Sequence, residues 1–174
     1  MADEVYLQTQ TVEISHTERF DCGSKKIEME KVRLTKEFSF EMAHALMGYD
    51  GACREIHGHS YKFFVTVEGA PSVEEGDPKL GMAVDFGDLK RAVCEAVVEP
   101  YDHSFMIRRT PESEEIIEVL QRHFTKIHVV DWQPTCENLL HHFASLIAPK
   151  LPTGVRLASL RLHETATSYA ELSL

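Results

Sequence analysis

The sequence predicts an α+β protein in which helices cover one face of an antiparallel sheet. Segments with strand-like alternation open and close the patterned part of the chain, and segments with helical periodicity lie between them. This order of strands, helices and strands is typical of α+β folds. We expect a four-stranded open sheet, whose edges another copy of the chain could pair with.

The composition indicates a soluble globular domain. The chain has 174 residues, of which 43% are hydrophobic and 26% are charged, so it is long enough to bury a core. A net charge of -10 argues against nucleic acid as a partner. No stretch is apolar enough to cross a membrane, and the N-terminus lacks the features of a secretory signal, so we expect a cytoplasmic protein.

Two strands are predicted in the first half of the chain. Residues 1–31 are weakly patterned and are treated as an N-terminal extension, whereas residues 32–174 are expected to form a single domain. Residues 32–44 alternate with a period of two and end on His44. A glycine-containing loop then leads to a second strand over residues 57–69. One face of this second strand carries His57, His59, Tyr61, Phe63, Val65 and Val67.

Residues 85–100 are predicted to form the first helix. Their apolar side chains recur at the spacing of one helix face, Asp85 or Asp88 can cap the start, and Pro100 follows the end. Residues 134–152 are predicted to form the second, with Thr135 as its N-cap. The other expected elements are a weaker helix over 110–124, a short strand over 126–132 and one or two strands over 154–172.

Three histidines are candidate metal ligands. His57 and His59 lie two residues apart, so a strand directs both to one face, about 6.5–7 Å apart along it. An antiparallel hairpin would bring His44 beside them. Three imidazoles with an open fourth position suit a catalytic zinc ion, whereas Cys53 as a fourth ligand would make a closed structural site. Three half-buried core histidines are an equally open interpretation.

Cys53 is a candidate base or nucleophile. The four cysteines (Cys22, Cys53, Cys94 and Cys136) contain no C-x-x-C pair, and all four are interpreted as thiols. A thiol beside a metal or a cation can take part in chemistry, and loops on a rigid scaffold often carry such residues. A lone cysteine is, however, usually a small buried apolar residue.

Asp102, His103 and Glu164 are further candidates. An aspartate that accepts from one ring nitrogen of a histidine leaves the other free for proton transfer. Because adjacent side chains seldom bond each other directly, a different partner for each is favoured. Glu164 shares the parity of Leu160 and Leu162, so its carboxylate would lie on an apolar face and need a partner there. An edge-strand glutamate that points to water is the alternative.

Five short motifs resemble one known family. "FSFEMAHAL" with C-x-x-x-H-G-H-S, "VDFGDLK", "YDHSF", "PTCENL" and "LHETATSYAEL" occur in the order found in the 6-pyruvoyl-tetrahydropterin synthase and 6-carboxytetrahydropterin synthase family. The resemblance covers residues 32–174. It implies the tunnelling fold, with a four-stranded antiparallel sheet and two helices on one face. It also implies trimers or dimers of trimers with the active site between subunits, and 7,8-dihydroneopterin triphosphate as the substrate.

The resemblance also implies a role for each candidate residue. It makes Cys53 the proton-abstracting base, and Asp102 and His103 an acid/base relay. It makes Glu164 the carboxylate that binds the 2-amino-pyrimidinone edge of the pterin and takes part in the relay. Thr135 and Cys136 fall where the family contacts the pterin, although Cys136 replaces a frequent hydroxyl residue. The zinc ligands implied by the resemblance are His44, His57 and His59.

The gap of three residues between Cys53 and His57 resembles the bacterial carboxy branch of the family. That branch forms 6-carboxy-5,6,7,8-tetrahydropterin and releases acetaldehyde, on the route to queuosine. A pyruvoyl product, or a non-catalytic pterin- or purine-binding protein with structural zinc, remains an alternative. The segment between His103 and Pro134 is longer than in the shortest members of the family. Lys36, Arg54 and Lys62 lie near the motifs, but none of them is assigned as a ligand of the triphosphate.

Overall fold

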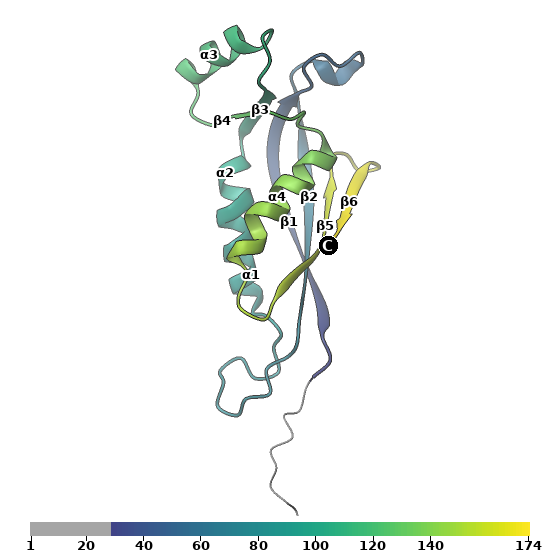
Figure 1. Cartoon of the computed structure of the whole chain (residues 1–174), viewed down its shortest axis with the longest axis vertical. Helices are drawn as coiled ribbons and strands as arrows, with labels where there is room; N and C mark the ends of the chain where they lie inside the picture. Colours follow the sequence, from purple (N-terminus) through teal and green to yellow (C-terminus); the bar gives the residue numbers. More distant parts are fainter. Residues whose placement is uncertain (1–28) are drawn as a thin grey trace, which may run out of the picture.

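The described part of the chain is built on one mixed sheet of six strands, in the order β4-β3-β1-β2-β5-β6 (Figure 1). The computed structural model describes residues 29–174, so nearly all of the expected extension, 1–31, lies outside the described residues. The strands are β1 (Val32–Ala45), β2 (His57–Gly69), β3 (Ser104–Arg108), β4 (Ile127–Val130), β5 (Arg156–His163) and β6 (Tyr169–Ser173).

The prediction of a four-stranded antiparallel sheet was wrong. β1, β2, β5 and β6 form the expected antiparallel part, but β3 and β4 extend the sheet beyond β1 in parallel pairings. β3 escaped prediction because its side chains are buried on both faces, which removes the alternation that marks a strand. The short strand expected over 126–132 is confirmed as β4.

The longer helical segments match the predicted positions, with one difference. Pro100 was expected to follow the first helix, yet the helical stretch continues through it to Tyr101. A π-turn lies directly before this proline, with the Glu99 N–H bonded to the Cys94 carbonyl, and so widens the helix where the proline ring would otherwise clash. The segments are η1 (Ala52–Arg54), α1 (Phe86–Val93), η2 (Cys94–Val98), α2 (Glu99–Tyr101), α3 (Glu114–His123), α4 (Cys136–Ile147) and η3 (Ala148–Lys150).

The main core lies between the sheet and one helical layer. The α1–α2 stretch and α4 lie side by side over one face of the sheet, which we call the α4 face (Figure 1). Even-numbered side chains of β1 and odd-numbered side chains of β2 fill this core, as the parity predicted. The fully buried residues include Tyr61, Phe63, Leu89, Phe143 and Leu160.

The expectation that all helices cover one face was also wrong. Ala45, Phe105 and Ile107 point to the opposite side, where they form a second core with Ile117 of α3. We call this side the α3 face. Because α3 covers only the β3–β4 end of it, the odd-numbered side chains in the middle of β1 remain exposed.

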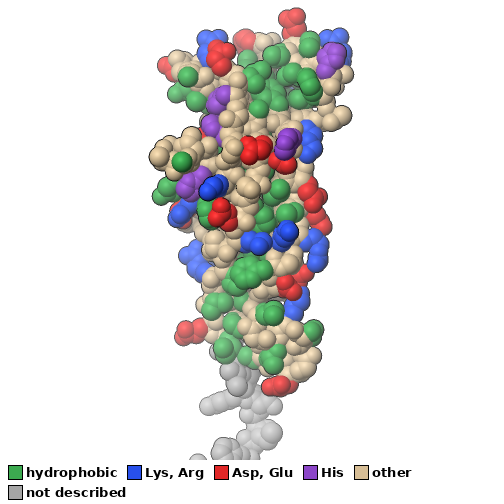
Figure 2. All heavy atoms as spheres, turned by 180° about the vertical axis from the view of Figure 1, so that it is seen from behind, with side chains coloured by type: hydrophobic (Ala, Val, Ile, Leu, Met, Phe, Trp, Pro, Cys, Tyr) green, Lys and Arg blue, Asp and Glu red, His purple; other side chains and the backbone are tan. Residues whose placement is uncertain are grey.

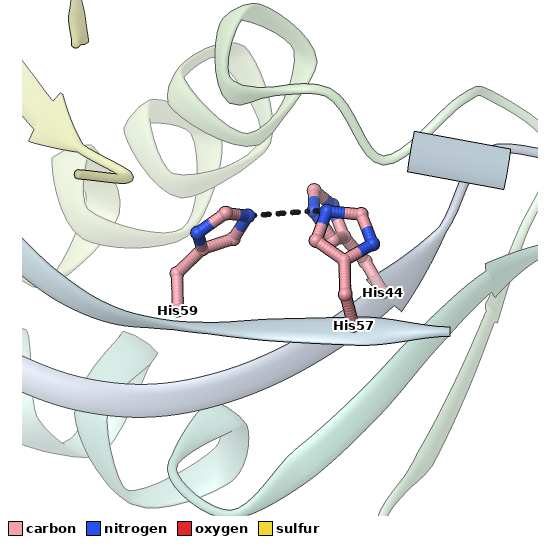
Figure 3. Close-up of side chains that lie close together, drawn as sticks. All are labelled: His44, His57 and His59. Carbon is pink, nitrogen blue, oxygen red and sulfur yellow. Dashed lines mark hydrogen bonds between the residues drawn. The ribbon is translucent and has the colours of Figure 1, made fainter. Parts of the chain in front are cut away.

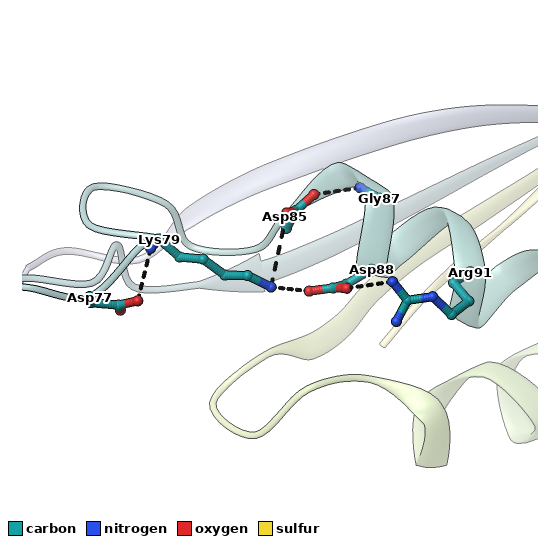
Figure 4. A network of polar contacts seen from close by, with 6 residues as sticks. All are labelled: Asp77, Lys79, Asp85, Gly87, Asp88 and Arg91. Carbon is teal, nitrogen blue, oxygen red and sulfur yellow. Dashed lines mark hydrogen bonds and ion pairs between the residues drawn. The ribbon is translucent and has the colours of Figure 1, made fainter.

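A polar network anchors the loop before α1 at the end of the sheet remote from α3 (Figure 4). The Lys79 ammonium pairs with Asp88 and lies 3.9 Å from Asp85. Asp85 accepts from the Gly87 N–H at 2.7 Å and is therefore the N-cap, one of the two predicted candidates. No helix among residues 29–174 is long and apolar enough to cross a bilayer.

Candidate metal centre and proton relay

The β1–β2 hairpin brings the three predicted histidines together. His44 pairs directly with His57 across the hairpin, and His59 pairs with Met42 one step further along. All three side chains project on the α4 face at the end of the strands. The predicted antiparallel hairpin and the predicted grouping of these histidines are confirmed.

The Nε2 atoms of the three rings converge on one point (Figure 3). His44 Nε2 lies 3.1 Å from His57 Nε2 and 3.2 Å from His59 Nε2. Two nitrogens bound tetrahedrally to one zinc ion at about 2.0–2.1 Å would be about 3.3–3.4 Å apart. The spacing of the rings therefore fits a single small cation.

The outer ring nitrogens of His44 and His57 explain why two of these Nε2 atoms are free. His44 Nδ1 donates to the Pro134 carbonyl at 2.6 Å, and His57 Nδ1 donates to the Glu55 carbonyl at 2.8 Å. In the neutral ring this leaves an unprotonated Nε2 directed at the centre. Lone pairs that face each other at this distance repel, so the arrangement favours a metal ligand set over ordinary core histidines.

Burial keeps the central histidine neutral. His44 is 2% exposed, and this burial lowers its pKa to about 4, although the Pro134 carbonyl opposes the shift. The neighbouring His57 and His59 lower it further. Burial also lowers the pKa of His59. A metal can thus bind near neutral pH without displacing a proton from His44.

Cys53 lies outside this group of ligand atoms. It sits in η1, in the loop between β1 and β2, where its carbonyl accepts from the Leu46 N–H at 3.0 Å. Its side chain is exposed, whereas Cys94 is half-buried and Cys136 is buried. Among the described residues, the cluster able to hold a metal consists of the three histidines, which leaves the Cys53 thiol available for other chemistry.

Asp102 and His103 bond each other, contrary to the expectation of different partners. His103 Nδ1 lies 2.9 Å from Asp102 Oδ2. The reason is the backbone of His103, whose φ of 58° is rare outside glycine and turns the two neighbouring side chains together. Asp102 Oδ1 accepts from the Glu41 N–H at 2.9 Å, and this bond, then His103, holds the pKa of Asp102 below its usual range.

The sheet separates this pair from the three histidines. His103 borders a hollow of about 310 Å³ whose lining also includes Glu41, Ser60 and His59. The side chains of Glu41 and Ser60 bond each other on the α3 face, opposite the side chain of His59. The His103 side chain is 77% exposed, so the ring is open to another molecule. Charged side chains occupy the middle of this face, and hydrophobic ones gather toward both ends (Figure 2). Within one chain, the metal centre and the Asp102–His103 pair therefore lie on opposite faces.

Glu164 lies on the face that its parity predicted, and the structure also places it near His57 and His59. It follows β5 directly, is half-buried, and its N–H donates to the Ser168 carbonyl at 3.2 Å. Burial and then Glu137 raise the pKa of its carboxyl, whereas His57 and the Tyr61 hydroxyl oppose the shift. A carboxyl in this setting is ready to bind a donor from a ligand.

Thr135 and Cys136 begin α4 on the same side of the sheet. Thr135 is the N-cap, as predicted, and accepts from the Asn138 N–H. The Cys136 thiol donates to the Leu162 carbonyl at 3.2 Å, and burial and the charge of Glu164 raise its pKa to about 12. The thiol therefore stays protonated and uncharged where it lines the region around Glu164.

Tyr61 completes this region and was not predicted as a site residue. Its side chain is fully buried, and its hydroxyl lies near Glu164 but makes no hydrogen bond of ordinary geometry within the described part of the chain. Burial and then the charge of Glu164 raise the pKa of this hydroxyl, so it stays protonated as a donor. The signal was present in the sequence, because Tyr61 shares the parity of His57 and His59.

Comparison with known proteins identifies relatives over most of the chain. Residues 33–173 match the family described as 6-pyruvoyl tetrahydropterin synthase. A protein of Haemophilus influenzae named 6-carboxy-5,6,7,8-tetrahydropterin synthase is 36% identical over 140 residues, covering 80% of this chain and 96% of its own. A protein of the same name from Aquifex aeolicus is 32% identical over 163 residues, covering 81% and 97%.

Solved structures share the fold at lower identity. An uncharacterized protein, WS1659 of Wolinella succinogenes, superimposes with a TM-score of 0.61 at 22% identity, covering 83% of this chain and 98% of its own. The 6-pyruvoyl tetrahydropterin synthase of Caenorhabditis elegans gives a TM-score of 0.57 at 21% identity, covering 84% and 98%.

Proposed function

Because this chain belongs to the 6-pyruvoyl tetrahydropterin synthase family, we propose that it makes 6-carboxy-5,6,7,8-tetrahydropterin. The substrate would be 7,8-dihydroneopterin triphosphate, and acetaldehyde and triphosphate would be released. The observation that carries the choice of product is the name shared by the bacterial relatives, which this chain matches over nearly their whole length. The three residues between Cys53 and His57 support the same choice.

His44, His57 and His59 would hold a zinc ion through their Nε2 atoms. Bound there, zinc supplies a Lewis acid for the hydroxyl groups of the substrate side chain. The bonds to the Pro134 and Glu55 carbonyls would orient two of the rings, as outer contacts of metal-bound histidines commonly do.

Glu164 would bind the pterin ring. Its carboxylate can accept from the ring N–H and the 2-amino group of a pyrimidinone edge, a paired arrangement that favours the charged form. Thr135 and Cys136 would form the adjoining wall of this pocket. The proximity of Glu164 to His57 and His59 supports a pterin that extends its side chain toward the metal centre.

Cys53 would remove a proton from the substrate side chain, and His103 would return one, steadied by Asp102. The location of the histidine cluster on the α4 face and of His103 on the α3 face supports an active site shared between two copies of the chain. Since His103 faces away from the metal centre of its own chain, the relay that serves this centre would come from another copy. A trimer or a dimer of trimers, as the family resemblance implies, would supply it.

Product analysis tests this function. The zinc-loaded protein is incubated with 7,8-dihydroneopterin triphosphate, and the products are identified by mass. We expect 6-carboxy-5,6,7,8-tetrahydropterin together with acetaldehyde. A pyruvoyl product without acetaldehyde would assign the chain to the other activity of the family, and binding without turnover would indicate a pterin-binding protein.

A further inference from the structure

Lys126 bonds to the backbone that carries the Asp102–His103 pair. It directly precedes β4, within the long segment between His103 and Pro134. Its ammonium donates to the Glu99 carbonyl at 2.8 Å and to the Asp102 carbonyl at 2.7 Å. Carbonyls at the end of a helix lack partners within it, and a cation there is favourable.

The Asp102–His103 peptide group is thereby held at both of its polar atoms. Its carbonyl accepts from Lys126, and its N–H donates to the Glu41 carbonyl at 2.6 Å. This peptide precedes a residue with a φ of 58°. A non-glycine residue in this region is strained, so its conformation depends on the groups that surround it.

The pairing of β3 with β4 determines where Lys126 lies. The Phe105 N–H donates to the Lys126 carbonyl at 3.0 Å, which ties the start of β4 to the residues after His103. Two positions further, His128 Nε2 donates to the Pro100 carbonyl at 3.0 Å. Two side chains of this segment therefore bond three of the four backbone carbonyls before His103, those of Glu99, Pro100 and Asp102.

We propose that Lys126 is a positioning residue that fixes the orientation of His103 by holding the peptide bond before it. The long segment between His103 and Pro134 would then support the proton relay. This proposal rests on the proposed role of His103 in proton transfer.

The test compares three variants of the zinc-loaded full chain. Lys126→Met keeps the apolar stem but removes the donors, Lys126→Arg keeps a cation with donors, and Lys150→Met is the matched control. Lys150 is also an exposed lysine at a helix end, but it pairs with Glu95 at 3.5 Å, away from His103. The kcat and KM for 7,8-dihydroneopterin triphosphate are measured by acetaldehyde release.

We expect kcat to fall about 10- to 100-fold in Lys126→Met with KM within about threefold, because a misplaced catalytic group affects the chemical step most. Lys126→Arg should recover most of the loss, and Lys150→Met should match the wild type. The His103 amide should exchange its hydrogen about tenfold faster in Lys126→Met, since that backbone would open more easily.

A wild-type kcat in Lys126→Met, or an equal loss in Lys150→Met, would overturn the proposal. If Lys126→Met does not fold, Lys126→Gln replaces it in the same comparison. If the wild-type protein does not turn over the substrate, the proposed function fails, and the exchange of the His103 amide still decides whether Lys126 positions that residue.

Discussion

At the scale of single residues, metal binding at the candidate centre would depend on which nitrogen of each ring is free. We expect His44→Ala to lower zinc affinity by at least about 100-fold, because it removes the ligand between the other two. Zinc per chain after dialysis measures the effect, with His163→Ala as a control outside the cluster. Unchanged zinc content in His44→Ala would mean that these histidines do not bind the metal.

The proposed role of Cys53 as a base can be tested separately from metal binding. Cys53→Ala should keep its zinc and lose about 10²- to 10⁴-fold in kcat, the usual contribution of a positioned base. Metal analysis and acetaldehyde release on the same sample measure both, and Cys94→Ala is the control. Loss of zinc in Cys53→Ala would identify the thiol as a ligand.

Strand parity was sufficient to predict the histidine cluster, because a hairpin between two alternating strands leaves His44, His57 and His59 no other face. It could not predict the bond between Asp102 and His103, which depends on a left-handed backbone at a histidine. Lys126 carries no local signal either, since its contacts arise only when β4 pairs with β3.

At the scale of elements, periodicity predicted the long strands and helices because each buries one face. It failed for β3, which is buried on both faces, and for α3, whose packing side is not encoded in its own pattern. The parallel pairing of β1 with β3 brings together residues about 60 positions apart, and no local pattern reports it.

The contact between α2 and α4 should make stability depend on pH. The Tyr101 hydroxyl lies 2.6 Å from His142 Nε2, and burial, then His128, lowers the pKa of His142. Below pH about 6.5, the ordinary value for histidine, the unfolded chain gains a proton that the folded chain resists. The stability that neutral His142 contributes is therefore fully present above pH about 6.5, and it is lost as the pH falls from there through the lower pKa of His142 in the folded chain.

Thermal unfolding of the zinc-loaded protein between pH 7.5 and 5 checks this expectation. The unfolding temperature of the wild type should fall more steeply on acidification than that of His142→Gln, which cannot take up this proton. Parallel curves for the two proteins would show that His142 does not contribute to the pH dependence.

At the scale of the whole molecule, the sheet divides the candidate site. The metal centre and Glu164 lie on the α4 face, whereas the Asp102–His103 pair is exposed on the α3 face. Met42 of β1 pairs with His59 of β2 and with Ser104 of β3, so the histidine cluster and the Asp102–His103 pair lie at the same level along the strands. Their side chains nevertheless lie on opposite faces of the sheet. A working site would need two copies of the chain.

Complementation between inactive variants tests this central claim most directly. Cys53→Ala and His103→Ala are dissociated, mixed in equal amounts and reassembled, and acetaldehyde release is measured. Random mixing should restore about a quarter of the wild-type activity, because each site draws its two halves from different chains. The control mixture of Cys53→Ala with His44→Ala should stay inactive, since Cys53 and His44 belong to one β1–β2 hairpin and would serve the same half of the site. Activity no higher than that of the separate variants would contradict a site shared between chains.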